Sequence, residues 1–147
     1  FGGVRPGREI TVIKWEDVHF DHESVRIDSG AGKTRSSRII PMSANLKAWL
    51  ELTPKHKRQG LIVPANYKNK ISAIRHAAGV TGADILRHSF ASYHLAAHAD
   101  LKALQEAMGH GTTEMILKHY RALVSKQDAV KYWSIFPKST AGNLKAV

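Results

Sequence analysis

Four side chains spread along the chain have the chemistry needed to bind and transfer a phosphoryl group. Arg5 and Arg87 are permanent cations, His110 follows the helix-ending residue Gly109, and Tyr120 lies in a helical pattern. Two guanidiniums can bind the non-bridging oxygens of one phosphate and stabilise charge that develops during phosphoryl transfer. A tyrosine phenol can act as a covalent nucleophile if its site lowers the cost of losing the proton. This set of groups requires no metal ion.

The first third of the chain has the pattern of a small antiparallel sheet. Residues 9–15 are mostly apolar and fit either a helix or a strand. Short β-branched and aromatic runs at 17–20 and 24–27, separated by polar residues, predict a hairpin. A second turn at 29–32 precedes a third predicted strand that includes residues 39–41. We therefore expect about three antiparallel strands near the N-terminal end.

The rest of the chain is predicted to be helical. Leu86, Phe90, Tyr93 and Ala97 recur with the 3.6-residue period of one helix face. Side chains suited to N-caps precede most of the predicted helices, and Pro or Gly residues follow several of them. The expected helices cover 43–53, 67–78, 86–97, 100–109, 112–124 and 126–136, and residues 138–147 are expected to form a flexible tail. The predicted fold class is α+β, mainly helical with a small three-stranded antiparallel sheet.

The charge of the chain favours a polyanionic partner. Twenty-two Lys and Arg residues against twelve Asp and Glu residues give a formal net charge of +10. Such a surplus attracts nucleic acid through counterion release, although an anionic membrane surface would be attracted by the same charge. The chain has no cysteine, and no apolar run approaches the roughly 20 residues that span a bilayer. We expect a cytoplasmic protein with no membrane partner, and a single domain over residues 1–147.

The order of the chemical groups resembles the tyrosine recombinase (phage integrase) family. Arg5 is followed by Leu86-Arg87-His88-Ser89-Phe90-Ala91, then by Gly109-His110, and about ten residues later by Tyr120. The opening Gly3-Val4-Arg5-Pro6-Gly7, with Trp15-Glu16-Asp17-Val18 after it, is similar to that family's first-arginine segment. Lys33 lies after a turn between two strands, where the family has its catalytic lysine. The resemblance covers nearly the whole chain.

The resemblance implies a role for each of these side chains in cutting and rejoining DNA. Arg5 and Arg87 would bind the scissile phosphate, and Lys33 would protonate the departing 5′ oxygen. His110 would hydrogen-bond the phosphate and assist the phenol. Tyr120 would attack and form a 3′-phosphotyrosyl intermediate, which the 5′ hydroxyl of a second strand resolves. No metal, ATP or other cofactor is implied.

The resemblance also implies partners and a setting. We expect double-stranded DNA as substrate, with no small-molecule substrate, and site-specific recombination as integrase or resolvase of a prokaryotic mobile element, associated with the nucleoid. Members of the family act as homo-tetramers on paired sites, and the segment 125–147 is a candidate for exchange between protomers. The family has helices and a DNA-clamping domain ahead of its first arginine, so we expect the 147 residues to be part of a catalytic domain.

Two departures from the family pattern leave other functions open. Asp84 occupies the position where the family usually has a histidine, and a carboxylate beside a phosphodiester is repulsive unless it is paired or protonated. Arg8 stands where the family has an acid, and Glu9 follows it, which indicates a one-residue insertion. The first alternative is a DNA-binding relative that does not cleave. The second is an enzyme of the type IB topoisomerase kind, which relaxes supercoils without choosing a site.

Simpler structural interpretations apply to several of the same residues. Tyr120 shares a helix side with apolar residues and would by itself be taken for a core tyrosine. Lys33 lies in a basic hairpin with Arg35 and Arg38, and such clusters commonly face solvent or DNA. His94 and His98 have the i, i+4 spacing that suits a metal, but no third ligand stands at a matching position.

Overall fold

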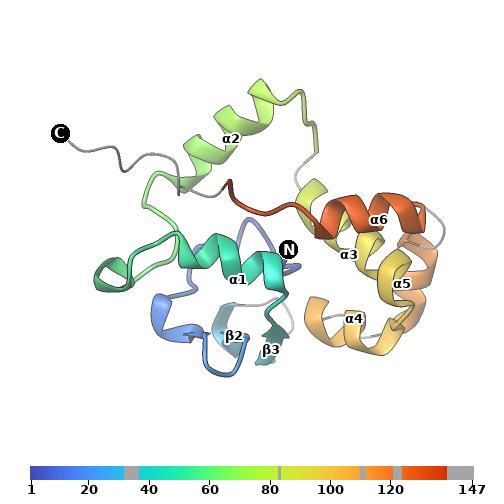
Figure 1. Ribbon diagram of the computed structural model, residues 1–147, viewed down its shortest axis with the longest axis horizontal. Coiled ribbons are helices and arrows are strands. Elements are labelled where there is room, and N and C mark those ends of the chain that lie inside the picture. Colours follow the sequence, from blue (N-terminus) through green and yellow to red (C-terminus); the bar gives the residue numbers. More distant parts are fainter. Residues whose placement is uncertain (32–36, 83, 110–111, 121–123, 139–147) are drawn as a thin grey trace.

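A three-stranded sheet and a group of four helices lie side by side in the computed structural model of the chain (Figure 1). The structure describes residues 1–31, 37–82, 84–109, 112–120 and 124–138. The predicted α+β class, mainly helical with a small antiparallel sheet, is confirmed. Among the described residues, no helix combines the length and apolar character needed to cross a membrane.

The sheet consists of β1 (Val18–His19), β2 (Ser24–Ile27) and β3 (Arg38–Pro41), antiparallel and in that order. Val25 lies opposite Val18 on one side and Ile40 on the other. Alternate residues face the core, so Ile40 is buried while its neighbour Ile39 is exposed.

The prediction of a helix or strand over residues 9–15 is wrong. Residues 6–12 form consecutive turns, η1 (Trp15–Asp17) is a short 3₁₀ helix, and Lys14 between them makes an isolated bridge to Leu61. Hydrogen bonds within the segment hold these turns: the carboxylate of Glu9 accepts one from the backbone nitrogen of Arg5 at 2.9 Å, and the carbonyl oxygen of Glu9 accepts one from the backbone nitrogen of Val12 at 3.1 Å.

Side chains at the helix ends explain where the helices start and stop. Ser43 and Asp100 accept hydrogen bonds from the backbone nitrogens of Leu46 (3.4 Å) and Ala103 (2.9 Å), and so cap α1 and α4. Gly109 ends α4 in the left-handed conformation, with φ +61°. The helices are α1 (Ala44–Glu51), α2 (Tyr67–Ala77), α3 (Ile85–His98), α4 (Leu101–Met108), α5 (Thr113–Tyr120) and α6 (Lys126–Trp133), with short 3₁₀ turns η2 (Ser29–Ala31) and η3 (Lys55–Lys57). The last helix ends at Trp133, three residues before the predicted residue 136.

Two hydrophobic clusters form the core, one in each half of the molecule. In the helical half, α3 packs against α4, α5 and α6. In the other half, α1 lies over the sheet, while α2 stands apart and buries none of its residues (Figure 1). The helical cluster contains Phe90, Ala91, Leu104, Ala107, Met108, Ile116 and Tyr120, and the sheet cluster contains Ile13, Val18, Val25, Ile27, Ile40 and Met42. The contact between α4 and β3 joins the halves, and the candidate site lies at this junction.

Candidate active site

A buried glutamate gathers three arginines at the junction of the two halves. The side chain of Glu9 has no exposed surface. Arg38 donates two hydrogen bonds to its carboxylate, at 2.9 and 2.7 Å, and Arg5 donates one at 2.5 Å. Nη1 of Arg87 lies 3.9 Å from Oε2 of the same carboxylate. One negative charge therefore faces three guanidiniums, which leaves a net charge of +2 in a small volume.

The arginines keep Glu9 ionised. Burial by itself would raise the pKa of this carboxyl group, but hydrogen bonds from Arg38 and Arg5 and the charge of Arg38 outweigh it, and the pKa falls to about 2. The carboxylate is thus negative at any pH at which the protein works. It offsets part of the repulsion among the guanidiniums and still leaves positive charge for an anionic ligand.

The same arginines also bind the C-terminal end of α4. The last carbonyl groups of a helix lack partners within the helix and carry the negative end of its dipole, so cations are favourable there. Each guanidinium donates a hydrogen bond to one backbone carbonyl oxygen at this end: Arg38 Nε to that of Ala107 (2.9 Å), Arg87 Nη2 to that of Met108 (2.5 Å) and Arg5 Nη2 to that of Gly109 (3.5 Å). Chain segments far apart in the sequence are thereby fixed around one point.

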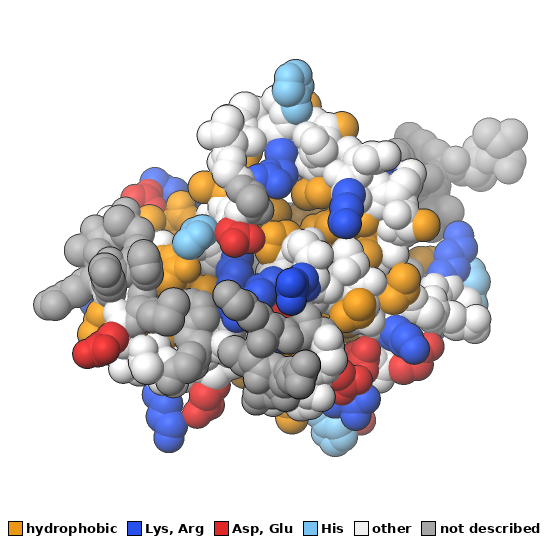
Figure 2. Space-filling model, turned by 180° about the vertical axis from the view of Figure 1, so that it is seen from behind, with side chains coloured by type: hydrophobic (Ala, Val, Ile, Leu, Met, Phe, Trp, Pro, Cys, Tyr) orange, Lys and Arg blue, Asp and Glu red, His pale blue; other side chains and the backbone are white. Residues whose placement is uncertain are grey.

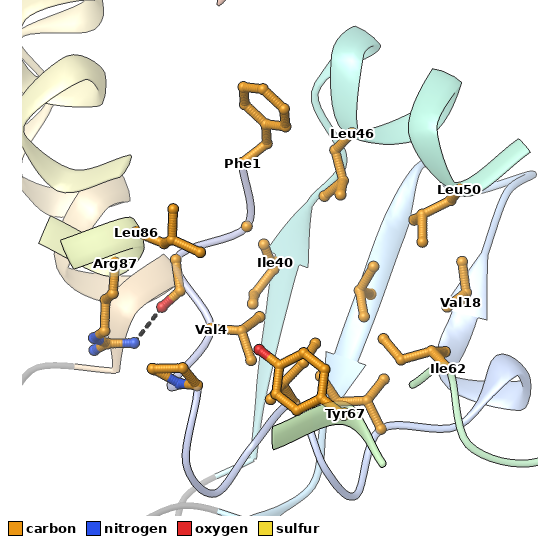
Figure 3. Close-up of a pocket in the computed structure, with 16 residues that line it drawn as sticks. Phe1, Val4, Val18, Ile40, Leu46, Leu50, Ile62, Tyr67, Leu86 and Arg87 are labelled. Carbon is orange, nitrogen blue, oxygen red and sulfur yellow. Dashed lines mark hydrogen bonds between the residues drawn. The ribbon is translucent and has the colours of Figure 1, made fainter. Parts of the chain in front are cut away.

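Arg87 is buried on the first turn of α3, with 6% of its surface exposed. Its Nη1 donates a hydrogen bond to the carbonyl oxygen of Gly3, as Figure 3 shows. Burial lowers the pKa of Arg87 to about 10, helped by the charges of Arg5 and Arg38 and opposed by Glu9. The guanidinium is still charged at neutral pH. Arg5, at 22% exposure, is the most accessible of the three arginine side chains.

An apolar cavity of about 240 Å³ lies beside Arg87, between the N-terminal segment, the sheet and α1 (Figure 3). Side chains such as Val4, Ile40, Leu46 and Ile62 line it, and the guanidinium of Arg87 is turned away toward Gly3. An apolar lining cannot hold a phosphate. The candidate site is therefore the arginine cluster and not this cavity.

Tyr120 ends α5 beside the arginine cluster. It is 5% exposed and belongs to the helical core, as its position among apolar residues predicted. Its ring lies 5.4 Å from that of His88, between centroids, at an interplanar angle of 44°. Burial raises the pKa of the phenol, the charge of Arg87 lowers it, and the charge of Asp84 raises it. The phenol is thus close enough to Arg87 for their charges to interact.

The structure brings together three of the four predicted site residues that it describes. Arg5 and Arg87 converge on one cluster, with Tyr120 next to it. Asp84 is exposed immediately before α3, and it lines a groove with Lys68 and Arg75 of α2. The other two predicted residues, Lys33 and His110, lie outside the described residues.

Sequence reasoning missed the importance of Glu9 and misjudged Arg38. Arg38 was expected in a cluster facing solvent or DNA, but its side chain is only 9% exposed. The strand pattern contained a usable signal, because Arg38 lies two residues before the buried Ile40 and so shares its inward face. Glu9 carried a weaker signal, an acid within a mostly apolar run.

Other features of the described residues do not add to the site. In the part of the chain that the structure describes, no group of three or more His, Cys, Asp and Glu residues is placed to hold a metal. The rings of His94 and His98, 4.8 Å apart, pack against Trp133 instead. In the space-filling view, Lys and Arg side chains gather near the middle of one face and continue toward α2 at the top (Figure 2). Such a basic surface suits a polyanion.

Comparison with known proteins agrees with this fold. The sequence profile of the Phage integrase family matches residues 2–127. The tyrosine recombinase XerC of Syntrophus aciditrophicus (strain SB) is 27% identical over 165 residues, covering 96% of this chain and 52% of the relative. The tyrosine recombinase XerA of Pyrococcus horikoshii is 27% identical over 145 residues, covering 84% of this chain and 50% of the relative.

Solved structures show the same fold. A crystal structure of XerA recombinase superposes with a TM-score of 0.61 at 21% identity, covering 90% of this chain and 52% of that one. The Tn1549 transposon integrase, solved in complex with a circular intermediate DNA, gives 0.62 at 17% identity, covering 91% and 55%. The fold is the one that these tyrosine recombinases and integrases share. The chain belongs to the phage integrase family, and it spans about half the length of the relatives it matches.

Proposed function

We propose that the protein cleaves and rejoins double-stranded DNA at specific sites, with Tyr120 as the nucleophile. The observation that carries the proposal is the arginine cluster, in which three guanidiniums share one buried carboxylate beside the Tyr120 phenol. An excess positive charge held rigidly next to a potential nucleophile is what transfer of a phosphodiester requires. Arg5, the most accessible of the three, and Arg87, whose charge interacts with the Tyr120 phenol, bind the scissile phosphate.

The reaction is a transesterification. The Tyr120 oxygen attacks phosphorus, the bond from phosphorus to the 5′ oxygen breaks, and the DNA 3′ end becomes a phosphotyrosyl ester. Because the ester keeps the energy of the broken bond, the 5′ hydroxyl of another strand can reverse the step without ATP. The resemblance to the family assigns Lys33 as the acid that protonates the leaving oxygen, and His110 as the donor that binds the phosphate and assists the phenol.

The proposal includes assembly on paired DNA sites, as integrase or resolvase of a mobile element. After α6 the chain runs along α1, where Asn45 Nδ2 donates to the carbonyl of Trp133 (3.3 Å) and Trp49 Nε1 to that of Ile135 (3.2 Å). These contacts are made within one chain here. A neighbouring protomer presents the same surface of α1, so the segment 125–147 can be exchanged in a tetramer. Sizing of the full-length protein on paired sites tests this, and a monomer would contradict it.

One observation favours a second candidate, a relative that binds DNA without cutting it. The charge of Asp84 raises the pKa of the Tyr120 phenol and repels a phosphate placed beside it. Both effects oppose nucleophilic attack. Under this candidate the arginine cluster binds the DNA backbone and no covalent step follows.

Covalent capture separates the candidates. The full-length protein is incubated with a pool of nicked duplexes of randomised sequence, in which a cleaved short strand diffuses away and traps the adduct. We expect protein–DNA adducts that survive denaturation, are enriched in one sequence, and disappear in Tyr120→Phe. Tyr93→Phe, which removes a hydroxyl elsewhere in the helical half, should retain them.

Each other result favours a different function. Binding to the pool with no adduct would establish the second candidate. Adducts without sequence preference, together with relaxation of supercoiled plasmid, would indicate chemistry of the type IB topoisomerase kind.

A further inference from the structure

An imidazole lies against the proposed nucleophile. His88 follows Arg87 on α3, its side chain is exposed, and its ring is 5.4 Å from that of Tyr120 between centroids. We infer that His88 accepts the phenol proton of Tyr120 during strand cleavage. This inference rests on the proposed function, because it assigns the proton in that reaction.

The surroundings of Tyr120 make a proton acceptor necessary. Burial and the charge of Asp84 both raise the pKa of the phenol, and the charge of Arg87 lowers it without offsetting them. A phenol in such a place is un-ionised at neutral pH, so its proton must leave as the oxygen attacks. A neighbouring base that accepts the proton in the transition state lowers the free-energy cost of ionising the phenol.

Among the described residues, His88 is the group suited to accept this proton. In the part of the chain that the structure describes, the charged side chains that interact with Tyr120 or Arg87 are Asp84 immediately before α3, Arg5 and Glu9 in the N-terminal segment, and Arg38 on β3. The guanidiniums cannot accept a proton, and Glu9 is committed to three of them. Of the two kinds of side chain that remain, imidazole is the common general base in enzymes, and it is the imidazole of His88 whose ring contacts that of Tyr120.

Each proton that moves in the reaction has a donor and an acceptor. The Tyr120 proton passes to a ring nitrogen of neutral His88, while the oxygen forms its bond to phosphorus and the phosphorus–5′ oxygen bond breaks. The leaving 5′ oxygen takes a proton from the acid of the proposed function. In rejoining, His88 returns its proton to the phenol. Exposure of the imidazole lets it equilibrate with solvent between the two steps.

The first test is a pH profile of cleavage with His88→Gln, whose amide keeps polarity and cannot take up the proton. Adduct formation is measured in a single turnover of full-length protein on the site recovered by covalent capture. General-base catalysis contributes about 10²–10⁴-fold, so we expect the rate at pH 7 to fall by about 100-fold or more. The deficit should shrink at pH 9–10, where hydroxide removes the phenol proton without help. His98→Gln, on the far end of α3, should cleave like the wild type.

The second test distinguishes help to the nucleophile from help to the leaving group. In a substrate with sulfur at the bridging 5′ position, the leaving thiolate needs no acid. If His88 serves Tyr120, the His88→Gln deficit persists on this substrate. If His88→Gln cleaves this substrate as fast as the wild type does, the inference is overturned, and His88 instead assists departure of the leaving group. DNA affinity and thermal unfolding are measured alongside, and His88→Asn gives an independent value if the Gln variant is unstable.

A deficit of less than about 10-fold at pH 7, or one that is the same at every pH, would overturn the inference while the proposed function stands. A wild-type protein that forms no adduct would remove the proposed function and the role of His88 with it.

Discussion

Replacing Glu9 with glutamine tests how the arginine cluster is held together. The substitution keeps the shape of the side chain and removes the one negative charge that three guanidiniums share. The difference between an ordinary carboxyl pKa of 4.5 and about 2, at about 1.36 kcal/mol for each pH unit, is about 3 kcal/mol of stabilisation. Removing one partner of a buried ion pair costs about 3–5 kcal/mol. We expect Glu9→Gln to lower the free energy of unfolding by an amount in this range at pH 7.

The pH dependence gives this prediction a definite sign. Because the pKa of Glu9 is depressed in the folded state, its contribution is complete above the unfolded pKa of 4.5 and is lost as the pH falls toward 2. The variant has no such group, so the stability difference between the two proteins should narrow below pH 4.5. Urea unfolding followed by circular dichroism at pH 7, 5, 4 and 3 measures it. Glu51→Gln, at an exposed position of α1, is the matched control.

Two results would refute the reasoning. One is a loss below about 1 kcal/mol at pH 7, a value typical of an exposed ion pair. The other is a difference between variant and wild type that stays constant from pH 7 to pH 3. Either result would mean that the charge of the Glu9 carboxylate does not offset the repulsion among the three guanidiniums.

Two further substitutions probe the packing around the site. Gly3→Ala should lower the free energy of unfolding by about 2–4 kcal/mol, because φ is +61° and a Cβ there would lie 2.6 Å from a ring carbon of Phe90. The control Gly2→Ala, where the nearest atom to an added Cβ is 3.5 Å away, should have little effect. Equal melting temperatures for the two variants would contradict this prediction. Burial and the charge of His98 lower the pKa of His94 to about 4, so between pH 6.5 and 4 the unfolded chain binds a proton at this residue that the folded chain excludes. This difference lowers the stability of the wild type as the pH falls, and His94→Leu should remove that loss. Relative to wild type the variant should gain about 1–2 kcal/mol on going from pH 7.5 to pH 5 in urea unfolding, and an unchanged difference would argue against it.

Much of the fold follows from local patterns in the sequence. The caps Ser43 and Asp100, the glycine that ends α4 and the hairpin before β3 all act over a few residues, so the printed sequence shows both partners of each interaction. Local patterns were less reliable for burial. Leu86 belongs to the predicted apolar stripe of α3 but is 56% exposed, while its neighbour Arg87 is buried.

The sequence by itself determined the fold class, most element boundaries, and the arginines and tyrosine that define the family pattern, because residue type and short-range spacing carry that information. Only the tertiary structure decided that Glu9 and Arg38 are the centre of the cluster, that Arg87 turns inward to Gly3, and that His88 meets Tyr120. Those contacts join segments as many as 84 residues apart. Their geometry is set by the packing of α4 against β3 and of α3 against α5, and no local pattern encodes a distance across that packing.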